Sequence, residues 1–302
     1  MKTVSIVYNP IKVKDLDERK AAAAGLCAQH GYAEPDWLET EEDDPGYAMG
    51  RQAVESGADL VCAMGGDGTV RFVAAALRGT GVPMGILPEG TGNLLARNLD
   101  VPLADFPTTL EIALNGQDRA IDVGLVRFDD QDEQVFLVIA GVGVDADTMA
   151  NTNEKLKKVM GWLAYAASAS RAMLSQGFRV RVRNDRPGPD DHAHRARSYM
   201  VCNCGVLTGG LVLVPEAEPD DGQLDTLVLS PRGPFGWAAV LADIITGHRR
   251  GQRMIRHWTT GEADAVFTRS PEGQIDGDAV GPVRRMRTSL DPGALLVRVQ
   301  KP

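Results

Sequence analysis

The chain has 302 residues, of which 43% are hydrophobic and 24% charged, a composition typical of a globular protein long enough for two domains. Its formal net charge of −9 argues against a basic surface for nucleic acid, so we expect no nucleic-acid partner. No segment offers about 18 consecutive apolar residues, and the N-terminus leads directly into a predicted strand. We therefore expect a cytoplasmic protein, or one that is peripheral to the inner face of a membrane.

The first 116 residues alternate between strand and helix patterns. Strands are predicted at residues 3–8, 37–40, 60–64 and 83–87, and helices at 15–29, 44–56, 73–77, from 91, and at 107–115. Such alternation in units of roughly 30 residues predicts a parallel sheet covered by helices. Ligands bind such sheets at the carboxyl ends of the strands, which is where Asn9, Thr40 and Thr91 lie.

The pattern changes near residue 120. Further along, β-type segments predominate, at 120–128, 134–144, 177–183, 197–207, 210–214 and 224–229, with helices predicted at about 153–176 and 234–246. This change predicts a first domain over 1–120 and a second domain over 121–291, mainly an antiparallel β-sandwich. Cys202 and Cys204 would lie on one face of a strand, where a disulfide rarely forms, so we expect free thiols.

A glycine turn follows the third predicted strand, with the sequence Gly65-Gly66-Asp67-Gly68-Thr69. Without Cβ atoms, its glycines allow a positive φ and a close approach of the backbone to a ligand. The amides of the turn and the positive end of the following helix then converge on one point, which suits a phosphate group. Asp67 would repel a phosphate directly, so we place it beside a magnesium ion or a water network. The alternative is a plain strand-to-helix turn.

Two segments resemble the signatures of one enzyme family. The glycine turn resembles the GGDGT motif of diacylglycerol-type lipid kinases, sphingosine kinases and NAD kinases, and residues 86–97, ILPEGTGNLLAR, resemble the LPxGTxNxxA block of bacterial diacylglycerol and lipid kinases. The resemblance extends over nearly the whole chain. It implies an α/β first domain like those of NAD kinases and phosphofructokinases, with helices on both faces of a parallel sheet. It also implies that the C-terminal strand, about 292–302, returns to this domain.

The resemblance further implies a nucleotide site for ATP with Mg²⁺. The residues that it assigns to this site are Asn9, Thr40, Gly65, Gly66, Asp67, Gly68, Thr69, Thr91 and Asn93.

An acidic loop, Pro215 to Asp225, resembles the family's DDGxL loop, which holds a structural magnesium ion. Carried over by position, Asp221 supplies a carboxylate oxygen, and Glu218 and Gln223 supply backbone carbonyls. Such hard oxygen ligands suit magnesium. The alternative is a simple hairpin turn, which Asp-Gly pairs favour in any case.

Residues Gln274 to Asp278 resemble the family's DGE motif, whose last carboxylate accepts a proton, so Asp278 is the candidate catalytic base. Asp67 is the second candidate catalytic residue. Asp147 is the nearest match to an aspartate that binds the lipid head in sphingosine kinases, while Asp145 fits a more general pattern of the family. The alternative for Asp276-Gly277 is again a hairpin turn.

The expected partners follow from the same resemblance. A lipid substrate, transient peripheral contact with a membrane and a homodimer are expected, and the basic, then apolar segment 155–166 is the candidate membrane contact, or else core packing. His192 and His194 form only a weak metal pattern, because no carboxylate or thiol spacing completes a site.

Three departures from the family pattern bear on function. Leu94 stands where many relatives carry a magnesium-linked Asp, Arg71-Phe72 replaces Asn-Glu, and Asp278 replaces Glu. We expect an ATP-dependent kinase that phosphorylates a lipid hydroxyl group and serves phospholipid synthesis. The alternatives are an NAD kinase-like enzyme and a catalytically weak protein that binds lipid and nucleotide.

Overall fold

The computed structural model describes residues 1–103, 105–143, 177–185, 193–246 and 254–301. They form two compact units, Met1–Val123 with Val206–Gly210 and Asp291–Pro302, and Gly124–Gly205 with Leu211–Leu290. The predicted lipid-contacting Asp147, its neighbour Asp145, His192, the candidate membrane segment 155–166 and the helix at about 153–176 lie outside the described residues.

The first unit is built on a parallel sheet. Its strand order is β2 (Asp36–Glu39), β1 (Val4–Tyr8), β3 (Leu60–Gly65), β4 (Met84–Pro88) and β18 (Arg285–Val299), the last paired with β4 through Val297 and Met84. Every residue of β1 and of β3 is buried. Parallel strands need apolar residues on both sides when helices cover both faces of the sheet.

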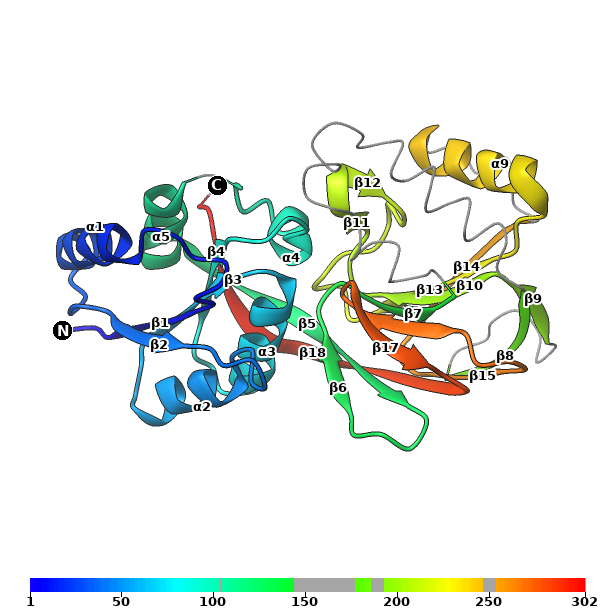
Figure 1. Cartoon of the computed structure of the whole chain (residues 1–302), viewed down its shortest axis with the longest axis horizontal. Coiled ribbons are helices and arrows are strands. Elements are labelled where there is room, and N and C mark those ends of the chain that lie inside the picture. Colours follow the sequence, from blue (N-terminus) through cyan, green and yellow to red (C-terminus); the bar gives the residue numbers. More distant parts are fainter. Residues whose placement is uncertain (104, 144–176, 186–192, 247–253, 302) are drawn as a thin grey trace. The chain divides into compact units, whose positions relative to one another are not determined.

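Helices cover both faces of this sheet (Figure 1). On one face lie α1 (Leu16–Gln29) and α5 (Phe106–Asn115), and on the other lie α2 (Tyr47–Glu55) and α3 (Asp67–Leu77). A short helix, α4 (Leu94–Asn98), follows β4. The core beneath α1 and α5 includes Ile6, Leu60 and Leu110, which are fully buried. The predicted parallel α/β fold is therefore confirmed.

Helix α2 begins later than the sequence pattern predicts. The helix is predicted to start at residue 44, but its N-cap is Gly46, whose φ of 140° favours glycine. The Asp44 carboxylate nevertheless accepts hydrogen bonds from the backbone N–H groups of Gly46, Tyr47 and Ala48 at 2.9, 2.6 and 2.9 Å. Burial alone would raise the pKa of Asp44, but these three hydrogen bonds lower it below its usual value. Asp44 thus satisfies the first-turn amides from two residues before the cap.

The second unit is a sandwich of two sheets. One contains β15 (Ala263–Phe267), β8 (Phe178–Asn184) and β9 (His194–Ala196), together with β18, β5 (Gln117–Phe128) and β6 (Gln134–Phe136). The other has the order β14 (Ile255–Thr260), β13 (Leu224–Leu229), β10 (Ser198–Cys202), β7 (Ile139–Val142), β16 (Glu272–Ile275) and β17 (Asp278–Pro282). Its neighbouring strands are antiparallel. The predicted antiparallel sandwich is confirmed.

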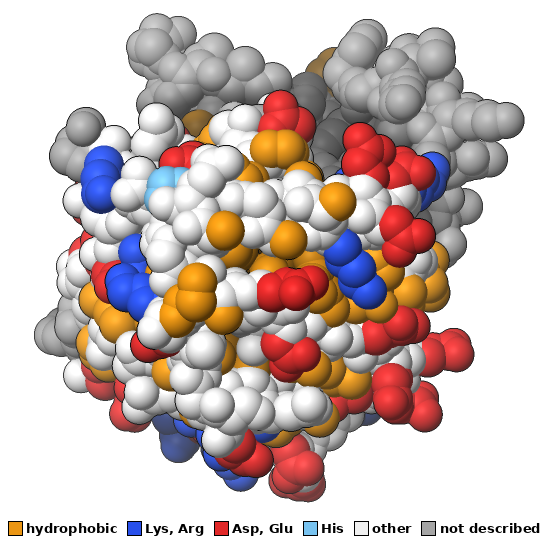
Figure 2. All heavy atoms as spheres, turned by 90° about the vertical axis from the view of Figure 1, so that its left-hand side faces the viewer, with side chains coloured by type: hydrophobic (Ala, Val, Ile, Leu, Met, Phe, Trp, Pro, Cys, Tyr) orange, Lys and Arg blue, Asp and Glu red, His pale blue; other side chains and the backbone are white. Residues whose placement is uncertain are grey.

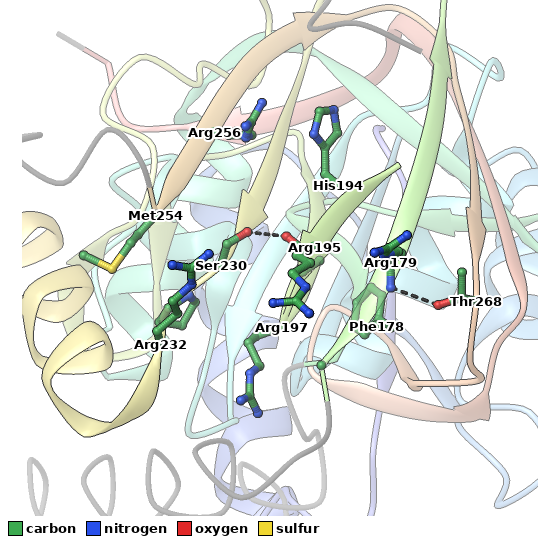
Figure 3. A pocket seen from close by; sticks show the side chains of 13 residues that line it. Phe178, Arg179, His194, Arg195, Arg197, Ser230, Arg232, Met254, Arg256 and Thr268 are labelled. Atoms are coloured by element: carbon green, nitrogen blue, oxygen red, sulfur yellow. Dashed lines mark hydrogen bonds between the residues drawn. The ribbon is translucent and has the colours of Figure 1, made fainter. Parts of the chain in front are cut away.

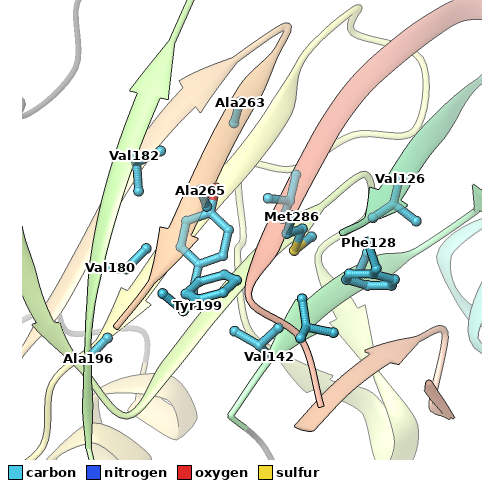
Figure 4. Packing of buried hydrophobic residues seen from close by; sticks show 14 of the residues in the cluster. Val126, Phe128, Val142, Val180, Val182, Ala196, Tyr199, Ala263, Ala265 and Met286 are labelled. Carbon is cyan, nitrogen blue, oxygen red and sulfur yellow. The ribbon is translucent and has the colours of Figure 1, made fainter. Parts of the chain in front are cut away.

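Apolar side chains from the two sheets form the core of this unit (Figure 4). Along β8, Phe178, Val180 and Val182 point inward, while the arginines between them are exposed. Tyr199 is fully buried and its ring lies 5.8 Å from that of Phe267. This alternation is what a strand with one buried face requires.

The remaining elements are short or peripheral. They are β11 (Val206–Leu207), the 3₁₀ turn η1 (Thr208–Gly210), β12 (Leu211–Val212) and helix α9 (Gly233–Thr246). All four cysteines are buried free thiols, as expected. Within the part of the chain that the structure describes, no helix is long and apolar enough to cross a membrane. The face seen in Figure 2 shows acidic and basic side chains interspersed rather than a continuous basic patch.

Candidate functional site

The polar residues predicted for the nucleotide site follow the carboxyl ends of four adjacent parallel strands. Asn9 follows β1, Thr40 follows β2, the glycine turn ends β3, and the segment from Glu89 follows β4. Adjacent parallel strands bring these positions to one edge of the sheet, the edge where ligands bind in such folds.

The glycine turn is tight because of contacts and not because of its φ angles. Gly66 has a φ of −89°, and neither Gly65 nor Gly68 is among the glycines with positive φ, so our expectation of positive φ in this turn was wrong. A Cβ atom on Gly65 would instead lie 2.6 Å from the Cβ atom of Thr69 in the first turn of α3. The turn therefore requires glycine to make room for its own helix.

A second glycine loop, residues 89–93, packs directly on the first. The backbone N–H of Glu89 donates to the carbonyl of Gly65 at 2.9 Å. A Cβ atom on Gly90 would lie 2.8 Å from the Cα atom of Gly66, and one on Gly92 would lie 2.4 Å from the Asp67 carboxylate. The two loops thus meet backbone to backbone at Gly66 and Gly90.

Asp67 joins the two loops. Its carboxylate accepts hydrogen bonds from the backbone N–H of Asn93 at 3.0 Å and from that of Leu94 at 2.5 Å, at the start of α4. Asn93 has a φ of 47°, and its side chain bonds both the N–H and the carbonyl of Gly90, at 3.0 and 2.8 Å. The Asp67 carboxylate thus holds this loop, and it contains oxygen atoms of the kind that magnesium takes.

The other predicted nucleotide residues differ in exposure. Thr69 and Thr40 are buried, and the backbone N–H of Thr40 donates to the carbonyl of Tyr8 at 2.9 Å. The side chain of Asn9 accepts hydrogen bonds from the N–H groups of Ile11 and Lys12 within its own loop. Thr91 is exposed.

Two features of this edge were not predicted from the sequence. Arg19 of α1 forms an ion pair with Glu89, and its guanidinium group lies 5.3 Å from the ring centre of Phe106. The side chain of Asn98 bonds both the N–H and the carbonyl of Val206, at 2.9 and 2.8 Å, and so ties the segment Val206–Gly210 to α4. No local pattern indicates either contact, since 70 and 108 residues separate the partners along the chain.

In the second unit, the turn at Asp276-Gly277 connects β16 to β17. Both residues have positive φ, 48° and 95°, as in a type I′ hairpin turn. The buried Asp276 carboxylate accepts hydrogen bonds from the backbone N–H groups of Leu137, Val138 and Ile139, each at 2.9 Å. The hairpin turn, which we gave as the alternative for Asp276-Gly277, is therefore present. It places the exposed Asp278 at the first position of β17.

The acidic loop before β13 is also a tight turn. The Asp221 carboxylate accepts a hydrogen bond from the N–H of Gln223 at 2.9 Å, around Gly222, whose φ is 70°. Asp221 and Glu218 are exposed. No group of three or more His, Cys, Asp or Glu side chains that could hold a metal occurs in the described ranges. The predicted set, which relies on one carboxylate and two backbone carbonyls, contains oxygen atoms of the kind that magnesium takes.

At the end of this loop, two side chains form a contact that no sequence pattern indicates. Asp225 at the start of β13 is buried, and its carboxylate lies 2.5 Å from Nε2 of His257 on the neighbouring strand β14. The two positions are separated by 32 residues, so the pairing of the strands was needed to find it.

Comparisons with known proteins agree with this arrangement. Residues 3–126 match the family described as the diacylglycerol kinase catalytic domain, and residues 137–299 match the YegS C-terminal NAD kinase beta sandwich-like domain. The chain belongs to the bacterial diacylglycerol and lipid kinase family. Membership in this family supports a kinase, that is, a phosphotransferase.

Relatives in this family share much of the chain. A probable lipid kinase YegS-like protein of Pseudomonas aeruginosa is 31% identical over 264 residues, which cover 86% of this chain and 83% of the relative. A diacylglycerol kinase of Bacillus subtilis is 25% identical, with 93% and 91% covered.

Solved structures show the same fold as this lipid kinase family member. A putative diacylglycerol kinase from Bacillus anthracis superposes with a TM-score of 0.76 at 21% identity, covering 99% of this chain and 95% of that one. An NAD kinase from Archaeoglobus fulgidus, solved in complex with ATP, gives a TM-score of 0.51 at 12% identity, covering 99% and 94%.

Proposed function

We propose that the chain is an ATP-dependent lipid kinase that transfers the γ-phosphoryl group to the hydroxyl group of a lipid, with a diacylglycerol-like lipid as the first candidate. The observation that carries the proposal is the contact between the two glycine loops at the strand ends. The backbones of the two loops meet there at Gly66 and Gly90, beside the N-terminus of α3, an eleven-residue helix. Such an edge suits the phosphates of a nucleotide.

The nucleotide would be held by residues of the first unit. Gly65, Gly66, Gly68 and Thr69 would offer backbone N–H groups to the phosphates, with Thr40, Thr91, Asn9 and Asn93 around them. Magnesium, when bound, would neutralise charge on the phosphate oxygens. Asp67 would support that ion, and the oxygen atoms of Asp221, Glu218 and Gln223 would hold a second, structural ion.

The acceptor side of the reaction would depend on Asp278. The oxygen of the lipid hydroxyl forms a bond to the γ-phosphorus atom, the bond from that phosphorus to the bridging oxygen of ADP breaks, and the hydroxyl proton passes to the Asp278 carboxylate. The exposure of Asp278 at the end of a rigid hairpin supports this role. Asp147 would contact the lipid head group, and the lipid would be reached at a membrane surface, in the service of phospholipid synthesis.

The test is a phosphorylation assay with ATP and a panel of diacylglycerol, phosphatidylglycerol and sphingosine, with NAD as a competing acceptor. Removing a general base lowers the rate by about 10²–10⁴-fold, and we expect a loss of that size in Asp278→Asn. Asp130→Asn, which changes an exposed aspartate elsewhere in the same unit, should leave the rate unchanged.

Two results would favour the other candidates. Phosphorylation of NAD without any lipid product would favour an NAD kinase, a function compatible with the fold shared with the Archaeoglobus enzyme. Binding of lipid without turnover, equally in wild type and Asp278→Asn, would favour a catalytically weak binding protein. The buried Leu94, in place of a magnesium-linked Asp, is the observation behind that candidate.

A further inference from the structure

The second unit contains a cavity of about 970 Å³, and none of the predicted site residues that the structure describes lines it. Its described lining comes from the edge strand β9 of one sheet and the edge strand β14 of the other, with residues of β8 and residues 230–232. Arginine side chains surround it (Figure 3). These are Arg179, Arg195, Arg197, Arg232 and Arg256. No Asp or Glu is among the described residues that line it.

Two of these arginines lie side by side on neighbouring strands of one sheet. Arg179 of β8 and Arg195 of β9 are directly paired in the antiparallel register, so their side chains lie on the same face. Like charges at directly opposite positions destabilise a strand pair. Both side chains are exposed, and a bound anion would turn this repulsion into an attraction.

Arg197 adds a second, independent sign of a missing partner. Its Nη1 atom is shielded from solvent and has no hydrogen-bond partner among the residues that the structure describes. A buried N–H donor that has lost its water without gaining an acceptor is costly. Because Arg197 also lines the cavity, a turn of its side chain toward the cavity would let this N–H group donate to an oxygen atom of a ligand.

Arginines elsewhere in the same sheet do have carboxylate partners. Arg285 of β18 bonds Asp264 of β15 through Nε and Nη2, at 2.8 and 2.5 Å. That hydrogen bond, with the nearby charges of Arg287 and Arg183, holds the pKa of Asp264 below its usual value. In a chain whose net charge is −9, five arginines around a cavity whose described lining contains no carboxylate are a local reversal of charge.

We propose that this cavity binds a phosphate group of an anionic ligand, at a site separate from the residues assigned to phosphoryl transfer. Guanidinium groups bind phosphate oxygens through two parallel hydrogen bonds each, and several of them together favour a multiply charged phosphate over a single carboxylate. Phe178, Met254 and Pro231 add apolar surface to the lining. The same chemistry serves a soluble phosphate ester and the head group of an anionic phospholipid. The proposal does not depend on the proposed kinase activity.

The test titrates inorganic pyrophosphate into the full-length protein by calorimetry, for wild type and two variants. Arg195→Gln/Arg256→Gln removes two exposed charges of the cavity and should weaken binding by about tenfold or more, because hydrogen bonds to charged groups are lost. Arg181→Gln is the matched control, since Arg181 is an exposed arginine of β8 that does not line the cavity. It should leave the affinity unchanged, and circular dichroism checks that all three proteins are folded.

A vesicle arm identifies the source of the phosphate. If the ligand is a lipid head group, the wild type sediments with phosphatidylcholine vesicles that contain phosphatidic acid, not with phosphatidylcholine alone, and the double variant loses this binding. If only pyrophosphate binds in a cavity-dependent way, the ligand is a soluble phosphate. The proposal is overturned if neither probe binds, or if the double variant binds as tightly as the wild type. It is also overturned if Arg181→Gln weakens binding as much as the double variant does.

Discussion

Gly90 and Gly66 are the residues through which the two glycine loops touch. Their backbones approach so closely that a Cβ atom on Gly90 would lie 2.8 Å from the Cα atom of Gly66 and 2.9 Å from Oδ1 of Asn93. Gly90→Ala should therefore lower the free energy of unfolding by about 1–3 kcal/mol, the usual cost of overpacking. Urea denaturation measures this loss, and ATP binding should weaken with it.

The matched control for this prediction is Gly25→Ala in helix α1. No atom lies within 4 Å of the position that the new Cβ atom would take. Replacing glycine by alanine within a helix stabilises by about 0.5–1 kcal/mol. The same substitution should thus have opposite signs at the two positions. A loss at Gly25 equal to that at Gly90 would mean that contact between the loops is not the cause.

Asp276 and Asp278 differ in role although one residue separates them. Asp276→Asn would bring an amide N–H₂ group into a buried place where three backbone N–H groups need acceptors. We expect a loss of about 2 kcal/mol or more in the free energy of unfolding. Asp278→Asn should leave stability unchanged, because that side chain is exposed. Denaturation curves of the two variants, measured side by side, test the distinction, and equal losses would contradict it.

For single residues, the sequence identified the important positions of the glycine turn but not the contacts that make them important. The glycines of the turn were expected to adopt positive φ, whereas they are needed for contact with Thr69 and the second loop. Asp67 accepts hydrogen bonds from the amides of Asn93 and Leu94, a contact that the motif alone does not indicate. The motif identifies the turn, but the second loop that packs on this turn lies more than twenty positions further along the chain.

Helix α2 depends on a carboxylate outside the helix. Asp44→Ala should lower the free energy of unfolding by about 1 kcal/mol, as the loss of a capping side chain does. The pKa of Asp44 is lower in the folded protein than in the unfolded chain, so its contribution is present above about pH 4 and is lost as the pH falls through the folded value. The difference between wild type and variant should therefore shrink in acid.

Asp43→Ala provides the comparison for this helix start. Asp43 is exposed and is the residue just before Asp44, so its removal changes the same charge near the same helix. Thermal unfolding should show a larger effect of Asp44→Ala at pH 7 than at pH 3, and a small effect of Asp43→Ala at both pH values. A pH-independent loss in Asp44→Ala would contradict the role of its ionised carboxylate.

The bounds of strands were predicted accurately where one apolar run corresponds to one strand. The strands β1, β3 and β4 match their apolar runs closely, because parallel strands covered on both faces read as continuous apolar segments. The predicted strand 134–144 is instead two strands, β6 and β7, which belong to different sheets. An apolar run does not reveal the point at which the chain changes sheets.

Binding of nucleotide should raise the stability of the whole protein. A ligand at 100 times its dissociation constant adds about 2.7 kcal/mol to the folded state, so Mg²⁺ with ATP should raise Tm by roughly 5 °C. NAD at the same concentration should leave Tm unchanged. Differential scanning calorimetry measures both, and a shift with NAD but not with ATP would contradict the proposed nucleotide.

The division of the chain into units shows where sequence patterns stop being informative. A change from helix-rich to strand-rich patterns near residue 120 is visible in the sequence. By contrast, the five residues Val206–Gly210 belong with the first unit, held by Asn98, and no change in composition marks them. The inclusion of this segment in the first unit depends on long-range hydrogen bonds, which a local sequence pattern does not indicate.

The participation of β18 in the first unit has a consequence for synthesis of the protein. The residue of β18 that pairs with β4 is Val297, which is synthesised long after its partner Met84. Until then, a nascent chain carries a parallel sheet with an open edge of unpaired backbone groups, which invites pairing with other chains. The edge of the parallel sheet at β4 must therefore wait for β18, and the maturation of this sheet in the cell is timed by the synthesis of that strand.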